Sequence, residues 1–422
     1  MNSKKYVIEK FGAFCEGVTH DDGKAVFIKG ALPGETVFAK TELVKKSFNK
    51  ARLVKVIEPS KDRIKPQCKY FDKCGGCSLQ HLNYNAQLEY KAQKVKENIK
   101  KVGGIDVEID EIVPSSDIFR YRNKLSFPVR DKKIGLYEEN SHDVVDIQDC
   151  LLQKEWNALL IKALRNYMAD YNLSGYDEVK GDIRHIVARE KNGSMCITLV
   201  TSKRIKIDKF LDYIPFDSFV LYQNVNTKNN NVILSDEFYL IGGKGEYPDF
   251  HPASFYQVND EIEQKLYNEV LKNTQGETVI DAYCGAGNLT LKIASQANTV
   301  YGIEIVKQAV DEANRRANEQ RAYNVSFICG DCKTEFPRLA KKNLRSVTVV
   351  FDPPRKGVDE NTLAATLELK PQKIVYVSCN DATLARDLKI LSSDYKVDSV
   401  KVYDMFPQTV HVETIVCLSR RI

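Results

Sequence analysis

The sequence predicts three regions, the last of which is an α/β domain built on a parallel sheet. From about residue 250, apolar strand-like runs alternate with helix-like runs, as they do when crossover helices join parallel strands. Residues 1–58 instead contain short β-like runs separated by glycine turns, which is typical of a small β-barrel. The residues between them mix strand patterns with two helical patterns. We therefore predict a barrel at 1–58, a central α+β domain at 59–245 and the α/β domain at 246–422.

The composition is that of an ordinary globular protein. Of the 422 residues, 43% are hydrophobic and 28% are charged, enough to bury a full core in two or three domains. We expect a cytoplasmic protein with no membrane partner, because no apolar run has the length of a membrane span and the opening residues lack the apolar core of a signal peptide. The sequence indicates no obligate protein partner and leaves the oligomeric state open.

The net charge of +5 is distributed unevenly along the chain. Residues 1–101 contain 21 Lys and Arg against 11 Asp and Glu, whereas the remainder contains 41 against 46. A basic module joined to a slightly acidic one indicates that the basic module binds a polyanion, here RNA. The alternative is a barrel that only packs against the next domain. The lysines expected to contact RNA are Lys24, Lys29, Lys40, Lys45, Lys46 and Lys50.

Four of the eleven cysteines form a candidate metal site. Cys68, Cys74 and Cys77 lie close together in CKYFDKCGGC, and Cys150 follows much later. In a reducing compartment an odd number of cysteines favours metal or catalytic use over a disulfide framework. Four thiolates can hold a tetrahedral zinc ion or an iron–sulfur cluster. The spacing alone leaves both open, together with unligated cysteines.

The central domain contains two further patterns. A Gln- and Lys-rich helical run (YNAQLEYKAQKVKENIKKV) follows the cysteines, and FRYRNKLSFPVR at 119–130 has the pattern of a strand. Aromatic and cationic side chains on that strand could hold splayed RNA bases, or the strand could be an ordinary half-buried one. The residues concerned are Arg120, Tyr121, Arg122 and Lys124.

The α/β domain begins with a ligand pocket. The run TVIDAYCGAGNLTLKIA (278–294) has the pattern of a strand, a glycine loop and a helix, and glycines at 285 and 287 let the backbone approach a ligand. Glu304 ends the second strand, 23 residues beyond Asp281, where a carboxylate can accept hydrogen bonds from ribose hydroxyls. No GK[ST] follows, and these two acidic residues would repel a pyrophosphate. A sulfonium-bearing ligand fits better, so we predict a Rossmann-like domain that binds S-adenosylmethionine.

The next two strands also end in acidic residues. Asp331 ends the third strand and is a candidate neighbour of the adenine, and Asp352 ends the fourth strand in DPPRKG. Amino-group methyltransferases place an aromatic residue after the prolines to stack on the base. Arg355 occupies that position here, which disfavours nitrogen methylation.

A thiol and a carboxylate follow, and together they fit methylation of a uracil C5 carbon. Cys379 follows the strand KIVYV, and Glu413 begins the last strand in HVET. The C5 carbon is a weak nucleophile until a thiolate adds to C6, and a base must later remove the C5 proton. Taken alone, Cys379 would be a core thiol and Glu413 a surface charge. Cys284 is a rival thiol, but its position in the glycine loop faces the cofactor.

Five motifs in this order, FHPASFYQVN (250–259), DAYCGAGN, DPPRKG, SCNDATLARD and HVETIVCL, resemble those of the RNA uracil-5 methyltransferase family. The resemblance covers nearly the whole chain, because the first region with its GALPGE turn resembles a TRAM domain, an OB-like barrel. It implies that Cys379 is the nucleophile and Glu413 the base. The residues that it implies for the pocket of cofactor and target base are Gln257, Tyr283, Gly285, Asn288, Glu304, Asp331 and Asp352.

The resemblance also implies a cluster and a substrate. Ribosomal RNA members with this cysteine pattern carry a [4Fe-4S] cluster, so Cys68, Cys74, Cys77 and Cys150 are its expected ligands, with zinc as the runner-up. The expected substrate is a uridine of 23S ribosomal RNA, extruded from its stack. The alternatives are transfer RNA, or a non-catalytic RNA-binding factor of ribosome assembly. A cytosine-5 methyltransferase is disfavoured, because its nucleophile follows Pro or Thr whereas Cys379 follows Ser378.

Overall fold

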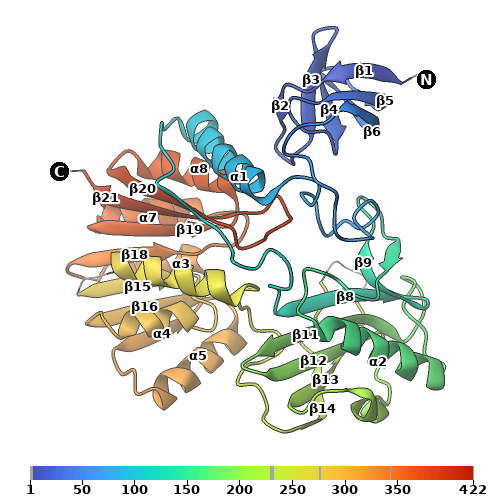
Figure 1. Cartoon of the computed structure of the whole chain (residues 1–422). Helices are drawn as coiled ribbons and strands as arrows, with labels where there is room; N and C mark the ends of the chain where they lie inside the picture. Colours follow the sequence, from blue (N-terminus) through green and yellow to red (C-terminus); the bar gives the residue numbers. More distant parts are fainter. Residues whose placement is uncertain (1–2, 229–231, 275–276, 343, 422) are drawn as a thin grey trace.

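The computed structural model describes residues 3–228, 232–274, 277–342 and 344–421. Their strands form one six-stranded, one seven-stranded and one eight-stranded sheet. In Figure 1 the six-stranded sheet (blue) lies at the top right, the seven-stranded sheet (mostly green) below it and the eight-stranded sheet (mostly yellow to red) at the left. Within these ranges, no helix has both the length and the apolar character required to cross a membrane.

The first sheet has the strand order β1-β5-β6-β4-β3-β2. Its two end strands, β1 and β2, are separated in the chain by only Ile8 and Glu9, and the Glu9 N–H donates to the Val18 carbonyl of β3 at 2.9 Å. One short segment therefore connects both ends of the sheet, which is compatible with the predicted barrel. The strands are β1 (Lys4–Val7), β2 (Lys10–Phe11), β3 (Gly17–Asp21), β4 (Lys24–Lys29), β5 (Thr36–Val44) and β6 (Phe48–Glu58).

The central sheet has the order β10-β9-β8-β11-β12-β13-β14. Its interior strand β12 is buried at every position, as expected of an apolar run with a strand on either side. Tyr167 of α2 is buried and its ring lies 5.1 Å from that of Phe210 in η2. The elements are β8 (Lys124–Arg130), β9 (Lys133–Tyr137), β10 (Val144–Asp146), α2 (Trp156–Asp170), β11 (Ile183–Lys191), β12 (Ser194–Thr201), η2 (Asp208–Tyr213), β13 (Phe219–Val225) and β14 (Phe238–Lys244).

The third sheet has the order β17-β16-β15-β18-β19-β21-β20-β7. Strands β15 to β19 are parallel, as the alternating sequence pattern predicts, whereas β21 is antiparallel to both of its neighbours. The first residue of β21 therefore lies at the edge where β19 ends. The elements are α3 (Asp260–Asn273), β15 (Thr278–Ala282), α4 (Asn288–Ala294), β16 (Thr299–Glu304), α5 (Lys307–Glu319), β17 (Val325–Cys329), α6 (Cys332–Ala340), β18 (Val347–Phe351), α7 (Glu360–Leu369), β19 (Lys373–Ser378), α8 (Asp381–Leu391), β20 (Tyr395–Tyr403) and β21 (Glu413–Arg420).

One segment of the predicted central domain belongs structurally to the third sheet. Helix α1 (Tyr84–Asn98) continues as the short π-helix η1 (Ile99–Gly103), and β7 (Glu111–Val113) pairs in parallel with β20. Val95 and Ile99 are fully buried in the core of the C-terminal domain. The apolar face of this segment therefore packs against the C-terminal domain, although the predicted boundaries assign the segment to the central domain, 59–245. Figure 1 shows α1 beside α8, next to the red strands.

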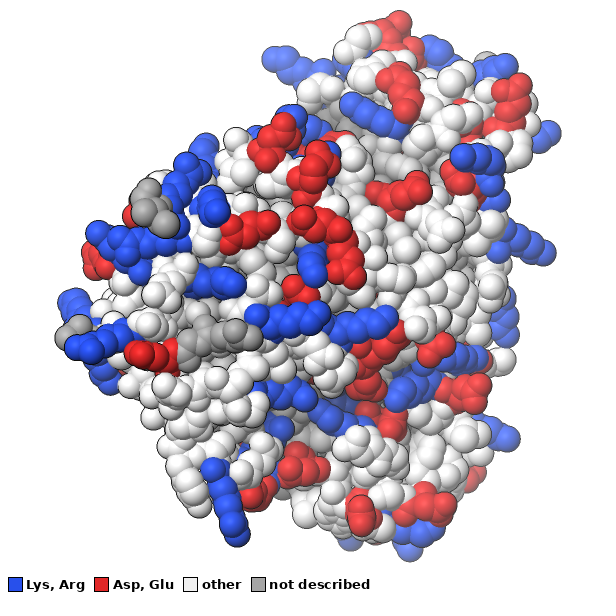
Figure 2. All heavy atoms as spheres, turned by 60° about the vertical axis from the view of Figure 1, so that its left-hand side comes forward, with Lys and Arg blue, Asp and Glu red and all other residues white. Residues whose placement is uncertain are grey.

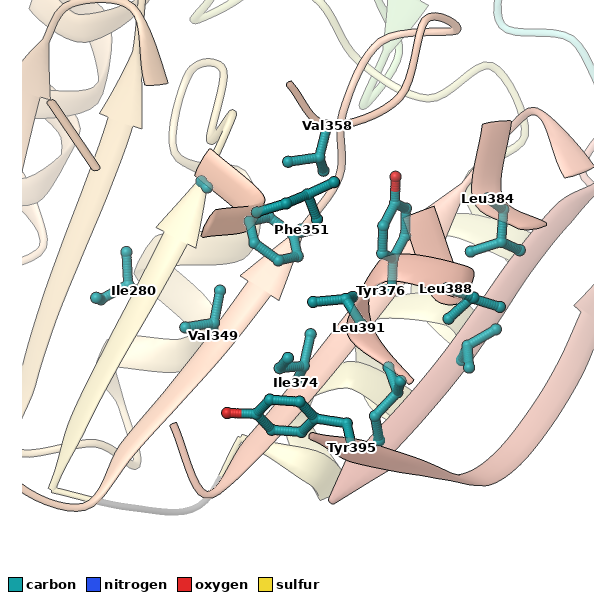
Figure 3. Close-up of a cluster of buried hydrophobic side chains, with 14 of the residues drawn as sticks. Ile280, Val349, Phe351, Val358, Ile374, Tyr376, Leu384, Leu388, Leu391 and Tyr395 are labelled. Atoms are coloured by element: carbon teal, nitrogen blue, oxygen red, sulfur yellow. The ribbon is translucent and has the colours of Figure 1, made fainter. Parts of the chain in front are cut away.

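A buried layer beneath the carboxyl edge of this sheet joins α8 to β18 and β19. The Tyr376 hydroxyl donates to the Asp387 carboxylate at 2.6 Å, which ties β19 to α8. This packing fixes the strand ends from which the candidate active-site residues project. Figure 3 labels the side chains of the layer and its neighbours: Ile280, Val349, Phe351, Val358, Ile374, Tyr376, Leu384, Leu388, Leu391 and Tyr395.

Candidate active site

Cys379 occupies the single position between the end of β19 and the N-cap of α8. The Asn380 side chain caps α8 by accepting from the backbone N–H groups of Ala382 (3.0 Å) and Thr383 (3.3 Å). The Ser378 hydroxyl accepts from the Asn380 N–H at 3.1 Å. These bonds define a tight strand-to-helix turn and leave the Cys379 side chain partly exposed. The sequence predicted this placement of the thiol at the end of a strand.

Glu413 is the first residue of β21 and lies beside Cys379. Ser378 of β19 pairs with Thr414 of β21 as the last pair of this antiparallel ladder, and Cys379 and Glu413 are the residues next to that pair. The charge of Glu413 raises the pKa of Cys379, which shows that the two side chains lie near each other. Glu413 is 3% exposed. Burial raises its pKa well above the ordinary value, nearby Asp352 raises it further, and Arg355 opposes both effects. The structure therefore brings the predicted nucleophile and base together.

Asp352 and Arg355 complete the charged surroundings of the thiol. Asp352 follows β18 directly, and burial raises its pKa to about 7. The pKa of Cys379 is raised to about 11, first by burial and then by Glu413 and Asp352, while Arg355 lowers it. The sequence pattern indicates only that Arg355 stands where a stacking aromatic residue would otherwise be. Its cationic influence on Cys379 and Glu413 depends on how the fold brings the strand ends together, which no local pattern specifies.

The glycine loop lies at the same edge, two strands away. The Gly285 N–H donates to Glu304 Oε2 at 3.1 Å, and the Val306 N–H donates to Glu304 Oε1 at 2.8 Å. Gly285 has a φ of +55°, and a Cβ at this position would meet only open space. The carboxylate of Glu304 thus holds Gly285 in a backbone conformation that favours glycine. The open space beside Gly285 leaves room for a ligand. This arrangement fits the predicted cofactor pocket.

Other predicted pocket residues make local contacts. Tyr283 has a φ of +68° and its hydroxyl donates to Asp359 at 3.2 Å. Asn288 accepts from Arg316 of α5. Asp331 follows β17 and caps α6, accepting from the Lys333 N–H at 3.1 Å. Gln257 is buried, and its carbonyl accepts from Asn123 and Arg189, both at 3.2 Å. The last two bonds fasten the segment 250–259 to the central domain.

Asp281 also lies at this edge, where the sequence predicts an acidic residue that disfavours a pyrophosphate. It is buried within β15 and accepts from the Thr290 hydroxyl at 2.6 Å. Burial raises its pKa to about 7, and Asp352 and Glu304 contribute in the same direction. The acidic residue inside the apolar run TVIDA is the signal by which the sequence indicates it.

The four predicted metal-ligand cysteines line one small pocket. Burial raises the pKa of Cys74 to about 11 and that of Cys77 to about 12, and Cys68 and Cys150 each raise both further, so the four thiols lie near one another. The Cys68 N–H donates to the Gln80 side chain at 3.0 Å. Four sulfur donors with apolar walls fit a thiolate-held cluster. In the described ranges, no group of three or more His, Cys, Asp or Glu side chains is already arranged around a metal position. The apolar walls include Phe71, Leu136, Ile147, Leu151 and Leu152.

In the strand pattern FRYRNK, two residues are held by distant partners, and two cations form no ion pair with a carboxylate among the described residues. Arg120 binds both Asp149 carboxylate oxygens at 2.7 Å, and the buried Tyr121 hydroxyl donates to the Pro407 carbonyl at 3.1 Å. Arg122 Nε is buried without a hydrogen-bond partner among the described residues. Burial lowers the pKa of Lys124 to about 8, and Arg189 and Arg122 add to the effect. Of the four residues in this pattern, Arg122 and Lys124 therefore remain candidates for contact with RNA.

Three comparisons relate this chain to known proteins. Residues 223–421 match the family model described as tRNA (Uracil-5-)-methyltransferase. An uncharacterized RNA methyltransferase of Clostridium tetani is 38% identical over 98% of this chain and 95% of its own length, and one of Clostridium acetobutylicum is 39% identical over 99% and 97%. The crystal structure of Pyrococcus abyssi tRNA (uracil-54, C5)-methyltransferase, in complex with S-adenosyl-L-homocysteine, has a TM-score of 0.80 and 28% identity. It covers 98% of this chain and 100% of its own.

Proposed function

This chain belongs to the RNA uracil-5 methyltransferase family, which uses S-adenosylmethionine, and we propose that Cys379 is its nucleophile and Glu413 its base. The observation that carries the proposal is the register of β19 and β21, which sets these two side chains beside each other at the carboxyl edge of the sheet. The glycine loop and Glu304 lie at the same edge. A thiol, a carboxylate and a cofactor pocket in one place are what C5 methylation requires.

The proposed reaction has two covalent stages. The Cys379 thiolate adds to C6 of the uracil ring, and the electron pair of the C5–C6 double bond makes C5 nucleophilic. S-adenosylmethionine supplies an electrophilic methyl group. The Glu413 carboxylate then takes the C5 proton, the double bond re-forms and the C6–S bond breaks, which frees the thiolate and 5-methyluridine. The proton passes from Glu413 to solvent.

The electrostatics of the edge support these roles. A carboxyl whose pKa is raised by burial is a stronger base once it is ionised, which suits Glu413 for removing a carbon-bound proton. Arg355 favours the charged forms of both Cys379 and Glu413. Arg355 therefore assists both the attack at C6 and the later removal of the proton.

We propose that the cofactor lies over the glycine loop, contacting Gly285 and Glu304. The open space at Gly285 and the acidic edge support this location. The remaining residues proposed to line the cofactor and target-base pocket are Gln257, Tyr283, Asn288, Asp331 and Asp352.

For the four-cysteine pocket we propose a [4Fe-4S] cluster, with zinc as the alternative. Such a group would tie the loop that carries Cys68, Cys74 and Cys77 to Cys150, and the methylation above needs no electron transfer. Anaerobic purification tests the assignment. A brown protein with broad visible absorbance and bound iron supports the cluster, whereas a colourless protein that contains zinc rejects it.

We propose that the RNA backbone beside the extruded uridine contacts Arg122, Lys124 and Arg355. Arg122 and Lys124 are partly buried cations that form no ion pair with a carboxylate in the described part of the chain, and Arg355 influences the ionisation of Cys379 directly. On the barrel, Lys29 forms an ion pair with Glu139, which leaves it less available to phosphates. Figure 2 shows basic and acidic side chains interspersed over the face that lies at the left of Figure 1.

The proposed substrate is 23S ribosomal RNA, because the TRAM-like barrel and the four cysteines together resemble the ribosomal members of the family. Transfer RNA is the second candidate, favoured by the description of the matching family model and by the substrate named for the Pyrococcus abyssi relative. Mapping 5-methyluridine in RNA from cells that lack this protein distinguishes the two. Loss of a 23S site supports the first, and loss of a transfer RNA site supports the second.

A 5-fluorouridine trap tests the chemistry. A base can remove the proton at C5 of uridine but cannot remove a fluorine from the same position, so the covalent complex persists. Transcripts of 23S ribosomal RNA and of transfer RNA made with 5-fluorouridine are incubated with S-adenosylmethionine and the protein. We expect a denaturation-resistant protein–RNA complex with the wild type and with Cys196→Ala, a buried thiol of the central domain, but not with Cys379→Ala. RNA binding without any such complex on either transcript would instead support a non-catalytic assembly factor.

A further inference from the structure

Helix α1 carries a stripe of polar side chains on one face. Its members, separated by four, three and four positions, fall on the same side of an α-helix. Lys91 is fully buried and Gln87 is 1% exposed, which is unusual for such residues. The stripe consists of Gln87, Lys91, Lys94 and Asn98.

Three members of the stripe contact the loop 404–412, which leads directly into Glu413. Lys94 Nζ donates to the Val410 carbonyl at 3.5 Å, and Lys91 and Gln87 make the closer contacts. Lys91 Nζ lies 2.5 Å from Asp404 Oδ1 and donates to the Phe406 carbonyl at 3.1 Å. Gln87 and Gln408 form two reciprocal bonds: Gln87 Nε2 donates to Gln408 Oε1 at 3.0 Å, and the Gln408 N–H donates to Gln87 Oε1 at 3.1 Å. Gln408 has a φ of +69°, a backbone conformation that such a residue rarely adopts without support.

Lys94 and Asn98 contact the start of the helix that follows Cys379. Lys94 Nζ lies 3.3 Å from Asp381 Oδ1, and the Asn98 amide donates to Asp381 Oδ2. Asp381 begins α8, two residues after Cys379. A single rigid helix thus contacts the segments that deliver both the nucleophile and the base.

The buried ion pair indicates a role in placement. Lys91 and Asp404 both have side chains with 0% exposure, and burial lowers the pKa of Lys91 while Asp404 opposes the shift. Replacing a buried ion pair by apolar residues is often neutral or stabilising, so such a pair contributes little net stability. What it does provide is a single allowed position for the two groups. Here that position fixes the start of the loop that ends at Glu413.

We propose that α1 is a positioning element for catalysis, in which Lys91 and Gln87 hold Glu413 opposite Cys379. The inference rests on the proposed roles of Cys379 and Glu413. Neither Lys91 nor Gln87 touches the reacting atoms, and both act through the loop 404–412. On its other side this loop is held by the backbone N–H groups of Ser78 and Leu79, which donate to the Gln408 carbonyl at 3.0 Å. Loss of an α1 contact therefore shifts the loop without releasing it.

A shifted base has a distinctive chemical consequence. Addition of Cys379 to C6 and methylation of C5 do not require Glu413, so both proceed. Removal of the C5 proton slows, and the C6–S bond cannot break until that proton is gone. A methylated covalent complex then accumulates on ordinary uridine RNA, without fluorine.

The test compares Lys91→Met and Gln87→Met with Lys96→Met, a matched control on the same helix whose Nζ pairs with exposed Glu108 at 2.6 Å. Turnover, the KM for RNA and the amount of denaturation-resistant complex are measured on 23S and transfer RNA transcripts containing ordinary uridine. We expect kcat to fall roughly tenfold to a hundredfold in the first two variants, because small displacements of a catalytic group have effects of this size. We expect the KM to change less than about twofold and the covalent complex to accumulate, with Lys96→Met unchanged.

Two results would overturn the inference: wild-type turnover in both variants, or lost turnover without accumulation of the complex. If Lys91→Met does not fold, as judged by thermal unfolding, Gln87→Met decides the matter because it leaves no buried charge unpaired. The wild type is run in parallel on 5-fluorouridine RNA. Absence of that complex rejects the proposed function itself, whereas its presence beside wild-type behaviour of both variants rejects only the role of α1.

Discussion

Cys379 and Glu413 are the neighbours of Ser378 and Thr414, the pair with which the antiparallel ladder of β19 and β21 ends. Because β21 runs against its neighbours, its first residue meets the last residues of β19. The backbone hydrogen bonds of two neighbouring strands therefore set where the proposed nucleophile and the proposed base lie. Sites built on strands are held more accurately than sites built on loops.

This relationship predicts the behaviour of Glu413→Gln. The amide fills the same buried space but cannot take the C5 proton, so we expect kcat to fall by roughly a hundredfold or more. A methylated covalent complex should persist on ordinary uridine RNA, visible as a band that resists denaturation. Release of 5-methyluridine at the wild-type rate by this variant would show that another group is the base.

A second prediction concerns the ionisation of Cys379. Its pKa is raised to about 11, so at pH 7 only roughly one thiol in ten thousand is ionised in the free protein. Below that pKa the thiolate fraction rises about tenfold per pH unit, and the rate of complex formation with 5-fluorouridine RNA should rise in parallel.

Substitution of Arg355 tests the origin of that pH dependence. Its charge lowers the pKa of Cys379, so Arg355→Met should raise that pKa and slow complex formation at every pH below it. Arg355→Lys should restore part of the rate. A profile with the same midpoint in Arg355→Met and in the wild type would contradict the electrostatic role of Arg355.

The features predictable from the sequence were those carried by local patterns. The strand KIVYV, the turn SCN and the glycine loop after TVIDA each identify their element without any distant contact, and Cys379 and Glu304 lie where these patterns placed them. The association of α1 with the C-terminal domain was not predictable in this way. Its Gln- and Lys-rich pattern has the composition of an exposed helix, and its buried partners, Asp404 and Gln408, lie more than three hundred residues later in the chain.

The sequence leaves open whether FRYRNK holds RNA bases or is an ordinary half-buried strand. The structure separates these alternatives residue by residue, through partners that lie far away in the chain. Arg120 donates to the Asp149 carboxylate and Tyr121 donates to the Pro407 carbonyl, so neither side chain is available to RNA bases. The pKa shifts of Asp281 and Asp352 likewise depend on burial beneath strands and helices that no local pattern specifies. Long-range packing, not local propensity, separates structural residues from available ones in these cases.

A third prediction uses S-adenosylhomocysteine as a matched control ligand. The pKa values of Asp281 and Asp352 are raised to about 7, so both carboxyls are largely neutral at pH 6 and largely ionised at pH 8. Ionised carboxylates attract the sulfonium of S-adenosylmethionine but not the neutral sulfur of S-adenosylhomocysteine. We expect the ratio of the two affinities to shift toward S-adenosylmethionine as the pH rises through 7, measured by calorimetry. Asp352→Asn should flatten this dependence, and a ratio that does not vary with pH would place the sulfonium away from both carboxyls.

The last prediction concerns the stability of the turn that presents Cys379. The buried Tyr376 hydroxyl donates to Asp387 Oδ2 at 2.6 Å, and the Val358 N–H donates to the same oxygen at 2.9 Å. Tyr376→Phe leaves that buried carboxylate one donor short. We therefore expect the free energy of unfolding to fall by about 1–3 kcal/mol in urea titrations. The matched control is Tyr323→Phe, whose side chain is 82% exposed and whose effect should stay within about 0.5 kcal/mol. Equal effects of the two substitutions would mean that the Tyr376–Asp387 bond does not stabilise the layer beneath the catalytic edge.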